Sequence, residues 1–315
     1  MMVDVHGHYF PDALISVAER VLDPDLVHLT RSRAPGAGFS PEQIIEQLDH
    51  AGIDMQVVSP ATLLPFVEDR GDAVAAAREM NDIYADLTRA FPARFAAFGV
   101  VPLPHVDAAI DEAARCIDEL KMVGIALGCS IAGRQLDDPM FEPLWAELDR
   151  RGTSIFLHPV GASDASLNAY NLNWMVGAPF EDTLAVLRLV LSGVTTRYPS
   201  MRVIVPHMGG TIPFLMTRID GPVGRSSNIG IELPVSKHLR KIFYDTSNRN
   251  PHALRCAVDT LGAEALVLGT DFPYSLDDRL RENVVYVAES GLGPDTIDRI
   301  LDANASRLLG LGGGA

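Results

Sequence analysis

The sequence predicts an α/β fold in which eight parallel strands close into a (β/α)8 barrel, also called a TIM barrel. Three observations support this prediction. Eight short apolar runs recur along the 315 residues, segments with apolar residues at helical spacing lie between them, and ionisable side chains directly follow several of the runs. Nearly continuous apolar runs are typical of strands covered on both faces, and intervening helices provide the crossovers that parallel strands need.

The expected strands are short runs rich in Val, Ile, Leu, Phe and Ala. An open nucleotide-binding sheet is disfavoured, because the sequence contains neither a GxGxxG turn nor a GxxxxGK turn followed by Ser or Thr. In chain order the runs are Met2 to Val5, Met55 to Ser59, Phe95 to Val101, Gly124 to Leu127, Ser154 to Leu157, Arg202 to Val205, Ile242 to Asp245 and Leu266 to Gly269.

Helices are expected where apolar residues recur every three or four positions. Asp72 is predicted to cap the first of them, and Asn250 before Pro251 is typical of a cap followed by a first-turn proline. The clearest expected helices are Ala73 to Ala90, Val106 to Leu120, Phe141 to Arg150, Thr183 to Thr195 and Pro251 to Leu261.

Two small insertions interrupt this alternation, at residues 10–40 after the first strand and at residues 159–180 after the fifth. Loops that follow the carboxyl ends of barrel strands build the active-site face. We therefore expect one barrel domain over residues 1–315, with the two insertions as walls or lids of a substrate site.

The charge balance excludes several classes of partner. The chain has 26 Lys plus Arg against 41 Asp plus Glu, a formal net charge of −15, which argues against binding to nucleic acid or an acidic membrane. The start of the chain lacks a leader-like apolar segment, and no run is long enough to span a membrane. Three scattered cysteines favour a reducing cytoplasm.

Ionisable residues follow four of the expected strands. His6 and His8 end the first run and share one face of a strand, since side chains alternate. Such a pair alone is more often two core or surface histidines than a metal site, but His158, His207 and Asp271 follow the fifth, sixth and eighth runs. Imidazole and carboxylate ligands at one rim suit Zn²⁺, with Mn²⁺ as the alternative.

A carboxylate substrate would need a local cation to overcome the negative charge of the protein. Arg218 is the first prediction for a substrate-binding residue, because it follows the His207 segment; Arg225 and Arg249 lie in similar positions, and Arg31 and Arg33 lie in the first insertion. For Arg218 a surface position is an equal alternative, and for the other four arginines it is the favoured one.

Seven segments in order resemble the amidohydrolase-related (amidohydrolase 2) family, which includes aminocarboxymuconate-semialdehyde decarboxylase. They are HGHYFP, AGIDMQVVSP, FLHPVG, NWMVGAPFEDT, VPHMGGTIPF, LGTDFPY and NASRLLGL. The resemblance runs from His6 to about Leu309 and implies a barrel of the amidohydrolase superfamily type. It also implies that His6, His8, His158 and Asp271 bind one zinc ion, and that His207 is the free acid-base group.

Members of this family mostly cleave carbon–carbon bonds to a carboxylate without oxygen or an organic cofactor, so the resemblance implies a non-oxidative decarboxylase in which Asp271 can also shuttle a proton. A hydrolase or hydratase of a lactone, amide or unsaturated acid is the alternative, and a metal-binding barrel without catalysis is a third. Relatives are commonly homodimers. The chain departs from the family at HMGG, at Val160, and in the first insertion, where Arg31 or Arg33 would replace a substrate-binding arginine.

Overall fold

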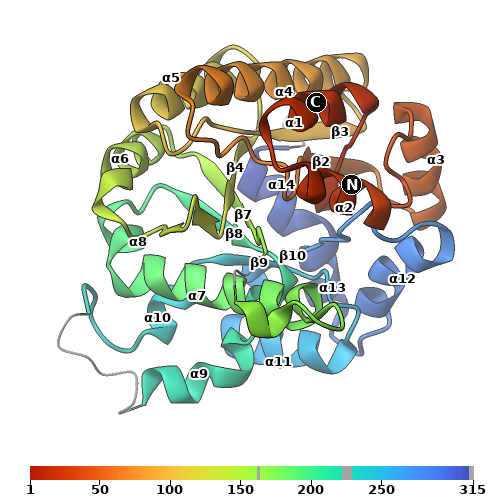
Figure 1. Cartoon of the computed structure of the whole chain (residues 1–315). Helices are drawn as coiled ribbons and strands as arrows, with labels where there is room; N and C mark the ends of the chain where they lie inside the picture. Colours follow the sequence, from red (N-terminus) through yellow and green to blue (C-terminus); the bar gives the residue numbers. More distant parts are fainter. Residues whose placement is uncertain (162–163, 222–228, 312–315) are drawn as a thin grey trace.

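Eight parallel strands form the centre of the molecule (Figure 1), as described by a computed structural model that covers residues 1–161, 164–221 and 229–311. Neighbouring strands pair in parallel in the order β1-β2-β3-β4-β7-β8-β9-β10. Their bounds are β1 Val3–His8, β2 Met55–Ser59, β3 Phe95–Gly99, β4 Gly124–Gly128, β7 Ser154–His158, β8 Arg202–Val205, β9 Phe243–Asp245 and β10 Leu266–Val267. The predicted eight-stranded α/β architecture is confirmed.

The seam between β1 and the segment after β10 closes the barrel. The backbone N–H of Val5 donates to the Leu268 carbonyl (2.9 Å), that of His8 to the Phe272 carbonyl (2.7 Å), and that of Asp271 to the His6 carbonyl (2.8 Å). The first and last strands of the sheet are therefore neighbours, and a backbone hydrogen bond holds Asp271 beside His6.

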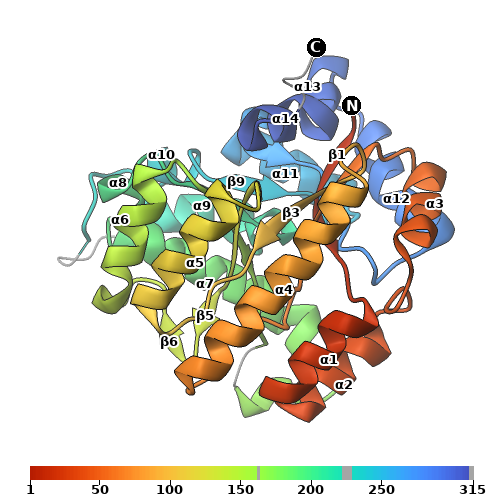
Figure 2. The same cartoon turned by 90° about the horizontal axis from the view of Figure 1, so that it is seen from above.

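Helices surround the strands, and the long helices α4 and α5 lie side by side on the outside (Figure 2). Among the described residues, none of the helices is both long and apolar enough to cross a membrane. The α-helices are α1 Asp12–Val21, α2 Pro24–Arg33, α3 Pro41–Ala51, α4 Arg70–Ala90, α5 Val106–Asp118, α6 Glu142–Arg150, α7 Ala178–Leu191, α8 Val194–Arg197, α9 Ile212–Asp220, α10 Ser236–Leu239, α11 Pro251–Leu261, α12 Asp277–Ala288, α13 Pro294–Asp298 and α14 Asn304–Leu309.

One predicted helix cap is wrong. Helix α4 begins at Arg70 and its cap is Asp69, whose carboxylate accepts a hydrogen bond from the Asp72 backbone N–H (2.9 Å). Asp72 thus lies inside the first turn, where its own N–H needs an acceptor. The cap at Asn250 is confirmed, since its side chain accepts from the N–H groups of His252 and Ala253.

The two predicted insertions contain short helices. Residues 10–40 form α1 and α2, and residues 159–180 include the 3-10 turn η2 (Ala165–Leu167) and the π-helical turn η3 (Asn173–Gly177). A small antiparallel hairpin of β5 (Ser130–Ile131) and β6 (Arg134–Gln135) follows β4, and strands of two residues carry no periodic signal from which to predict them.

Aromatic side chains fill the barrel beneath its carboxyl end. The rings of Phe98 on β3 and Phe156 on β7 stack with centroids 5.2 Å apart, and the ring of His6 meets Phe156 edge-on at 5.0 Å. All three side chains are buried. The upper layer of the core is therefore also the floor of the site described next.

Candidate metal centre

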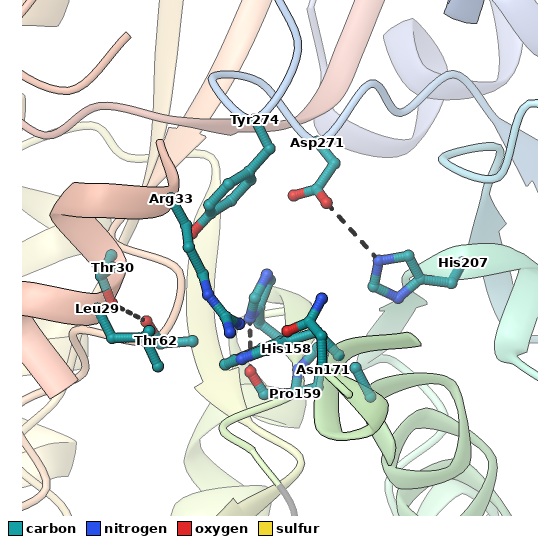
Figure 3. A pocket seen from close by; sticks show the side chains of 12 residues that line it. Leu29, Thr30, Arg33, Thr62, His158, Pro159, Asn171, His207, Asp271 and Tyr274 are labelled. Carbon is teal, nitrogen blue, oxygen red and sulfur yellow. Dashed lines mark hydrogen bonds and ion pairs between the residues drawn. The ribbon is translucent and has the colours of Figure 1, made fainter. Parts of the chain in front are cut away.

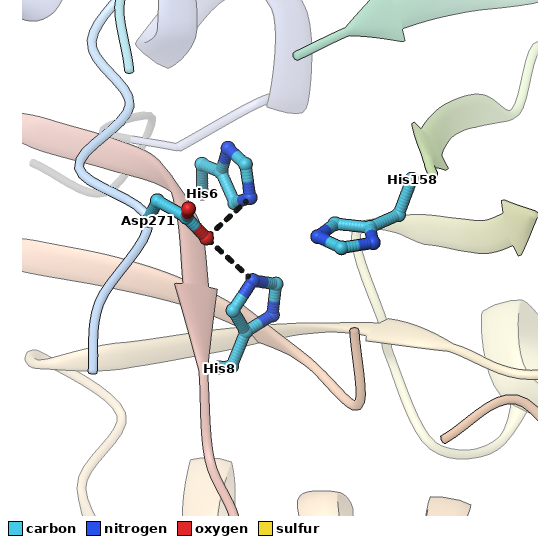
Figure 4. Close-up of side chains that lie close together, drawn as sticks. All are labelled: His6, His8, His158 and Asp271. Carbon is cyan, nitrogen blue, oxygen red and sulfur yellow. Dashed lines mark hydrogen bonds and ion pairs between the residues drawn. The ribbon is translucent and has the colours of Figure 1, made fainter. Parts of the chain in front are cut away.

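Four of the predicted ligands converge at the carboxyl end of the barrel (Figure 4). His6, His8, His158 and Asp271 each offer a ligand atom within 4.8 Å of the others. One carboxylate oxygen, Asp271 Oδ1, lies 3.2 Å from Nε2 of His6 and 3.2 Å from Nε2 of His8. The three histidines are buried, and the Asp271 side chain is 31% exposed toward the cavity above.

Strand β1 presents both of its histidines because positions i and i+2 lie on one face. Gly7 between them is packed against β2, and a Cβ atom at this position would lie only 2.3 Å from the Gln56 side chain. A larger residue would therefore force either β1 or the buried Gln56 side chain, which donates to Asp4 (2.7 Å), out of its place.

Each of the three histidines is held through Nδ1. His6 Nδ1 donates to the buried Asp245 carboxylate (2.6 Å), and His158 Nδ1 donates to the Pro159 carbonyl (2.8 Å). His8 Nδ1 contacts the Ser59 hydroxyl (3.1 Å). These acceptors fix the tautomer, so that Nε2 of each ring is the atom left to bind a cation.

The electrostatics of the cluster fit a bound cation. Burial lowers the pKa of His8 and of His158, which favours the neutral rings that a metal requires. Burial also opposes protonation of His6, but the carboxylates of Asp245 and Asp271 outweigh it and raise the pKa of His6 to about 10. Nε2 of His6 is buried and has no hydrogen-bond partner among the described residues. The three imidazoles and the carboxylate of the cluster are a typical donor set for a divalent transition metal.

His207 stands beside the cluster rather than in it. It follows β8 and opens the turn η4 (His207–Gly209), with φ of 53°, a backbone region that costs a non-glycine residue of order 1–3 kcal/mol and is common at functional sites. Its Nδ1 contacts Asp182 on α7 (2.8 Å), and its Nε2 lies 3.9 Å from Asp271 Oδ2. Burial opposes protonation of His207, but Asp182 and Asp271 together hold its pKa well above the usual value.

A cavity of about 510 Å³ opens above these residues (Figure 3). This volume is in the range typical of small-molecule sites. The cavity is lined by two residues of the cluster, His158 and Asp271. Arg33 from the first insertion, Trp174 from the second and Tyr274 after β10 also line it. Its lining comprises Leu29, Thr30, Arg33, Thr62, His158, Pro159, Asn171, Trp174, Ala178, His207, Asp271 and Tyr274.

The structure places a different arginine in the cavity from the one that the sequence predicted. Arg33, at the end of α2, lines the cavity with its guanidinium 5.9 Å from the centre of the Trp174 ring. Arg218 lies exposed in the last turn of α9, outside the lining of this cavity. Arg31 is exposed and pairs with Asp12 (3.3 Å), Arg249 lies 3.9 Å from Glu282, and Arg225 is outside the described residues.

Two buried carboxylates of the site were not predicted. Asp245 ends the expected seventh strand, so the same rule that selected Asp271 could have selected it. Asp182 lies within α7, and its contact with His207 depends on how that helix packs against the η4 turn, which sequence spacing does not reveal.

A (β/α)8 barrel with a cluster of three histidines and one aspartate at its carboxyl rim defines the class of metal-dependent amidohydrolase-type barrels. The chain belongs to the amidohydrolase (amidohydrolase 2) family, which matches residues 3–311. The resemblance predicted from the seven sequence segments is thereby confirmed, as is the amidohydrolase type of the barrel.

Similar proteins include several decarboxylases. The chain is 31% identical over 284 residues to 2-amino-3-carboxymuconate-6-semialdehyde decarboxylase of Dictyostelium discoideum, covering 87% of this chain and 77% of that protein. It is 29% identical over 293 residues to a gamma-resorcylate decarboxylase of Rhizobium, covering 85% and 86% of the two proteins.

Solved structures share the fold over nearly the whole chain. The IDCase of Metarhizium anisopliae is 25% identical, with a TM-score of 0.86 over 99% of this chain and 97% of that one. A dihydroxybenzoic acid decarboxylase of Polaromonas, whose structure contains bound manganese and an inhibitor, is 21% identical, with a TM-score of 0.85 over 99% and 98% of the two chains.

Proposed function

We propose that the protein is a carboxy-lyase, a metal-dependent and non-oxidative decarboxylase of a small conjugated or aromatic carboxylic acid. The observation that carries this proposal is one cavity in which the His6, His8, His158 and Asp271 cluster meets Arg33. The family membership and the decarboxylases among the relatives support the same reaction.

The four clustered side chains are the proposed ligands of one Zn²⁺ ion. Mn²⁺ is the alternative, supported by the manganese in the Polaromonas neighbour, and no organic cofactor is part of the proposal. When bound, the cation acts as a Lewis acid toward substrate oxygen atoms. The carboxylates of Asp245 and Asp271 offset its charge in the buried site.

The remaining side chains of the cavity bind and orient the substrate. The Arg33 guanidinium is the proposed partner of a substrate carboxylate, since this pairing is short, charge-assisted and can be bidentate. The rings of Trp174 and Tyr274 line the same space and suit a flat, conjugated substrate.

The proposed chemistry replaces CO2 by a proton. Asp271 and His207 bring a proton to the substrate carbon that bears the carboxylate; the bond to the carboxylate carbon then breaks, and its electron pair restores the conjugated system. Nε2 of His207 and Oδ2 of Asp271 lie 3.9 Å apart at the cavity wall, so the two groups can pass that proton between them through a water molecule or a substrate oxygen.

The test is CO2 release from a panel of hydroxybenzoates and carboxymuconate-type acids, with lactones as the control for hydrolysis. Metal analysis of the purified protein should find about one zinc or manganese ion per chain. His207→Ala should keep the metal and lose turnover, whereas His158→Ala should lose both. Full activity of the metal-free protein, or cleavage of lactones alone, would overturn the proposal.

Association into a homodimer in the cytoplasm completes the proposal. Large apolar side chains are exposed on η3, α7 and α9, among them Met175, Phe180 and Phe214, with exposures of 59%, 50% and 85%. Arg218 stays a predicted substrate-binding residue that would act only if association brings it to the cavity of a second copy. The three cysteines of the chain are free thiols, in keeping with a reducing compartment.

A further inference from the structure

A completely buried carboxylate lies behind the proposed acid-base histidine. Asp182 on α7 has no exposed surface, and its Oδ2 is 2.8 Å from Nδ1 of His207. We propose that Asp182 is a positioning residue that fixes the tautomer and the ring orientation of His207. This inference rests on the proposed function of His207 and adds a residue that the decarboxylation scheme above does not use.

The geometry assigns a separate task to each nitrogen of the ring. An ionised carboxylate only accepts hydrogen bonds, so Nδ1 of His207 must carry the proton that it shares with Asp182. Nε2 then faces the cavity and lies 3.9 Å from Asp271 Oδ2. In this orientation the atom available to exchange a proton with substrate is always Nε2.

The chain holds Asp182 and His207 in register through a tight contact between α7 and the η4 turn. Gly210 has φ of 63°, and a Cβ atom there would lie 1.9 Å from the Pro179 carbonyl oxygen. The Thr183 hydroxyl accepts from the Thr211 N–H (2.9 Å) and donates to the Pro179 carbonyl (2.8 Å). The HMGG segment, a departure from the family pattern, thus keeps the glycine that this approach requires.

A purely structural role does not account for the carboxylate. Contacts of Thr183 and Gly210 already join α7 to the turn, and the backbone N–H of His207 is held by Asp245 (3.0 Å). The other oxygen of Asp182 accepts from the Cys129 thiol at 3.4 Å, which is a weak donor. Burying a carboxylate is costly unless it has a strong partner, and that partner is the His207 ring.

The first test reads the tautomer directly. In the zinc-loaded protein, two-bond ¹H–¹⁵N spectra of the histidine rings, assigned with His207→Ala, should show a proton on Nδ1 of His207. In Asp182→Asn the amide can donate to Nδ1, so the ring proton should move to Nε2. A wild-type ring without a proton on Nδ1 overturns the inference, whether or not any variant folds.

The second test measures the steady-state kinetics of CO2 release, with the carboxylic acid of the panel above that the wild type decarboxylates fastest. Asp182→Asn should lower kcat at least about 100-fold with KM changed less than about threefold and with metal content unchanged. In the His207→Ala background the same substitution should cost nothing further. Arg188→Gln, on the same helix but in an exposed ion pair with Asp137, is the matched control.

The two tests separate two kinds of failure. Absence of CO2 release by the wild type overturns the proposed function, while the tautomer measurement still decides the role of Asp182. Unchanged kcat in Asp182→Asn, or an equal loss in the His207→Ala background, shows that Asp182 does not act through His207.

Discussion

At the residue scale, the four imidazole rings of the site are all held through Nδ1. His6, His158 and His207 each donate from Nδ1 to an oxygen acceptor, and His8 contacts Ser59 in the same way. Nε2 of every ring is thereby left for a cation or a proton. What distinguishes the proposed acid-base histidine from the three proposed ligands is its position beside the cluster, with Nε2 3.9 Å from Asp271 Oδ2 at the cavity wall.

Asp245 is expected to tune metal affinity. Asp245→Asn keeps the shape of the side chain but weakens the support of His6 Nδ1, and losses of roughly 10- to 100-fold in affinity are typical for such partners. Competition with a chelator measures the change. Asp182→Asn serves as the reference, because Asp182 supports His207 and should leave metal affinity within about twofold; equal losses in both variants would contradict the assignment.

Arg33 is expected to determine substrate binding. A charge-assisted hydrogen bond contributes about 1.5–3 kcal/mol, so Arg33→Ala should raise KM by roughly 10-fold or more. Arg31→Ala, two residues away on the same helix, removes only an exposed ion pair with Asp12 and should leave KM within about twofold. Steady-state kinetics of CO2 release measures KM for both variants. A larger rise in KM for Arg218→Ala than for Arg33→Ala would instead support Arg218 as the substrate-binding residue.

At the element scale, strand starts were more predictable than strand ends or helix starts, since six of the eight expected runs begin at the same residue as their strand. The expected runs at Met55 to Ser59 and Arg202 to Val205 match β2 and β8 residue for residue, because a buried parallel strand is a continuous apolar run. Helix α7 instead begins at Ala178, five residues before the expected Thr183, since its first turn is set by Pro179 and by packing against η4.

The cap of α4 gives a direct test of that difference. Asp69→Ala removes the acceptor of the Asp72 N–H and should lower the free energy of unfolding by about 1 kcal/mol. Asp72→Ala removes only a charge near the helix start and should cost about 0.3–1 kcal/mol at low salt and less at high salt. Urea unfolding at two salt concentrations measures both; a greater loss in Asp72→Ala would favour the cap expected from the sequence.

At the scale of the whole molecule, the barrel and the group of ionisable residues at its carboxyl end were predictable from eight recurring runs and from the residues that follow them, whereas the walls of the cavity were not. Trp174, Tyr274 and Arg33 come from insertions and loops whose packing has no period in the sequence. The negative charge of the chain gave no position for the local cation, because the position of Arg33 depends on the path of α2.

The exposed apolar surface predicts self-association. Sedimentation at micromolar concentration should give twice the mass of one chain, and Phe180→Ser combined with Phe214→Ser should shift the equilibrium toward single chains. The matched control is Tyr170→Ser, which changes another exposed ring, 87% accessible, outside α7 and α9. A wild type that sediments as a single chain at all concentrations contradicts the homodimer.

The contact between β1 and the segment after β10 also determines when, during synthesis of the chain, the proposed metal site can form. His6 and His8 precede Asp271 by more than two hundred residues, so a nascent chain cannot assemble the full set of proposed ligands until the segment after β10 has been made. A metal ion bound by these residues would then stabilise the contact between β1 and the segment after β10. Metal binding would thus follow closure of the barrel.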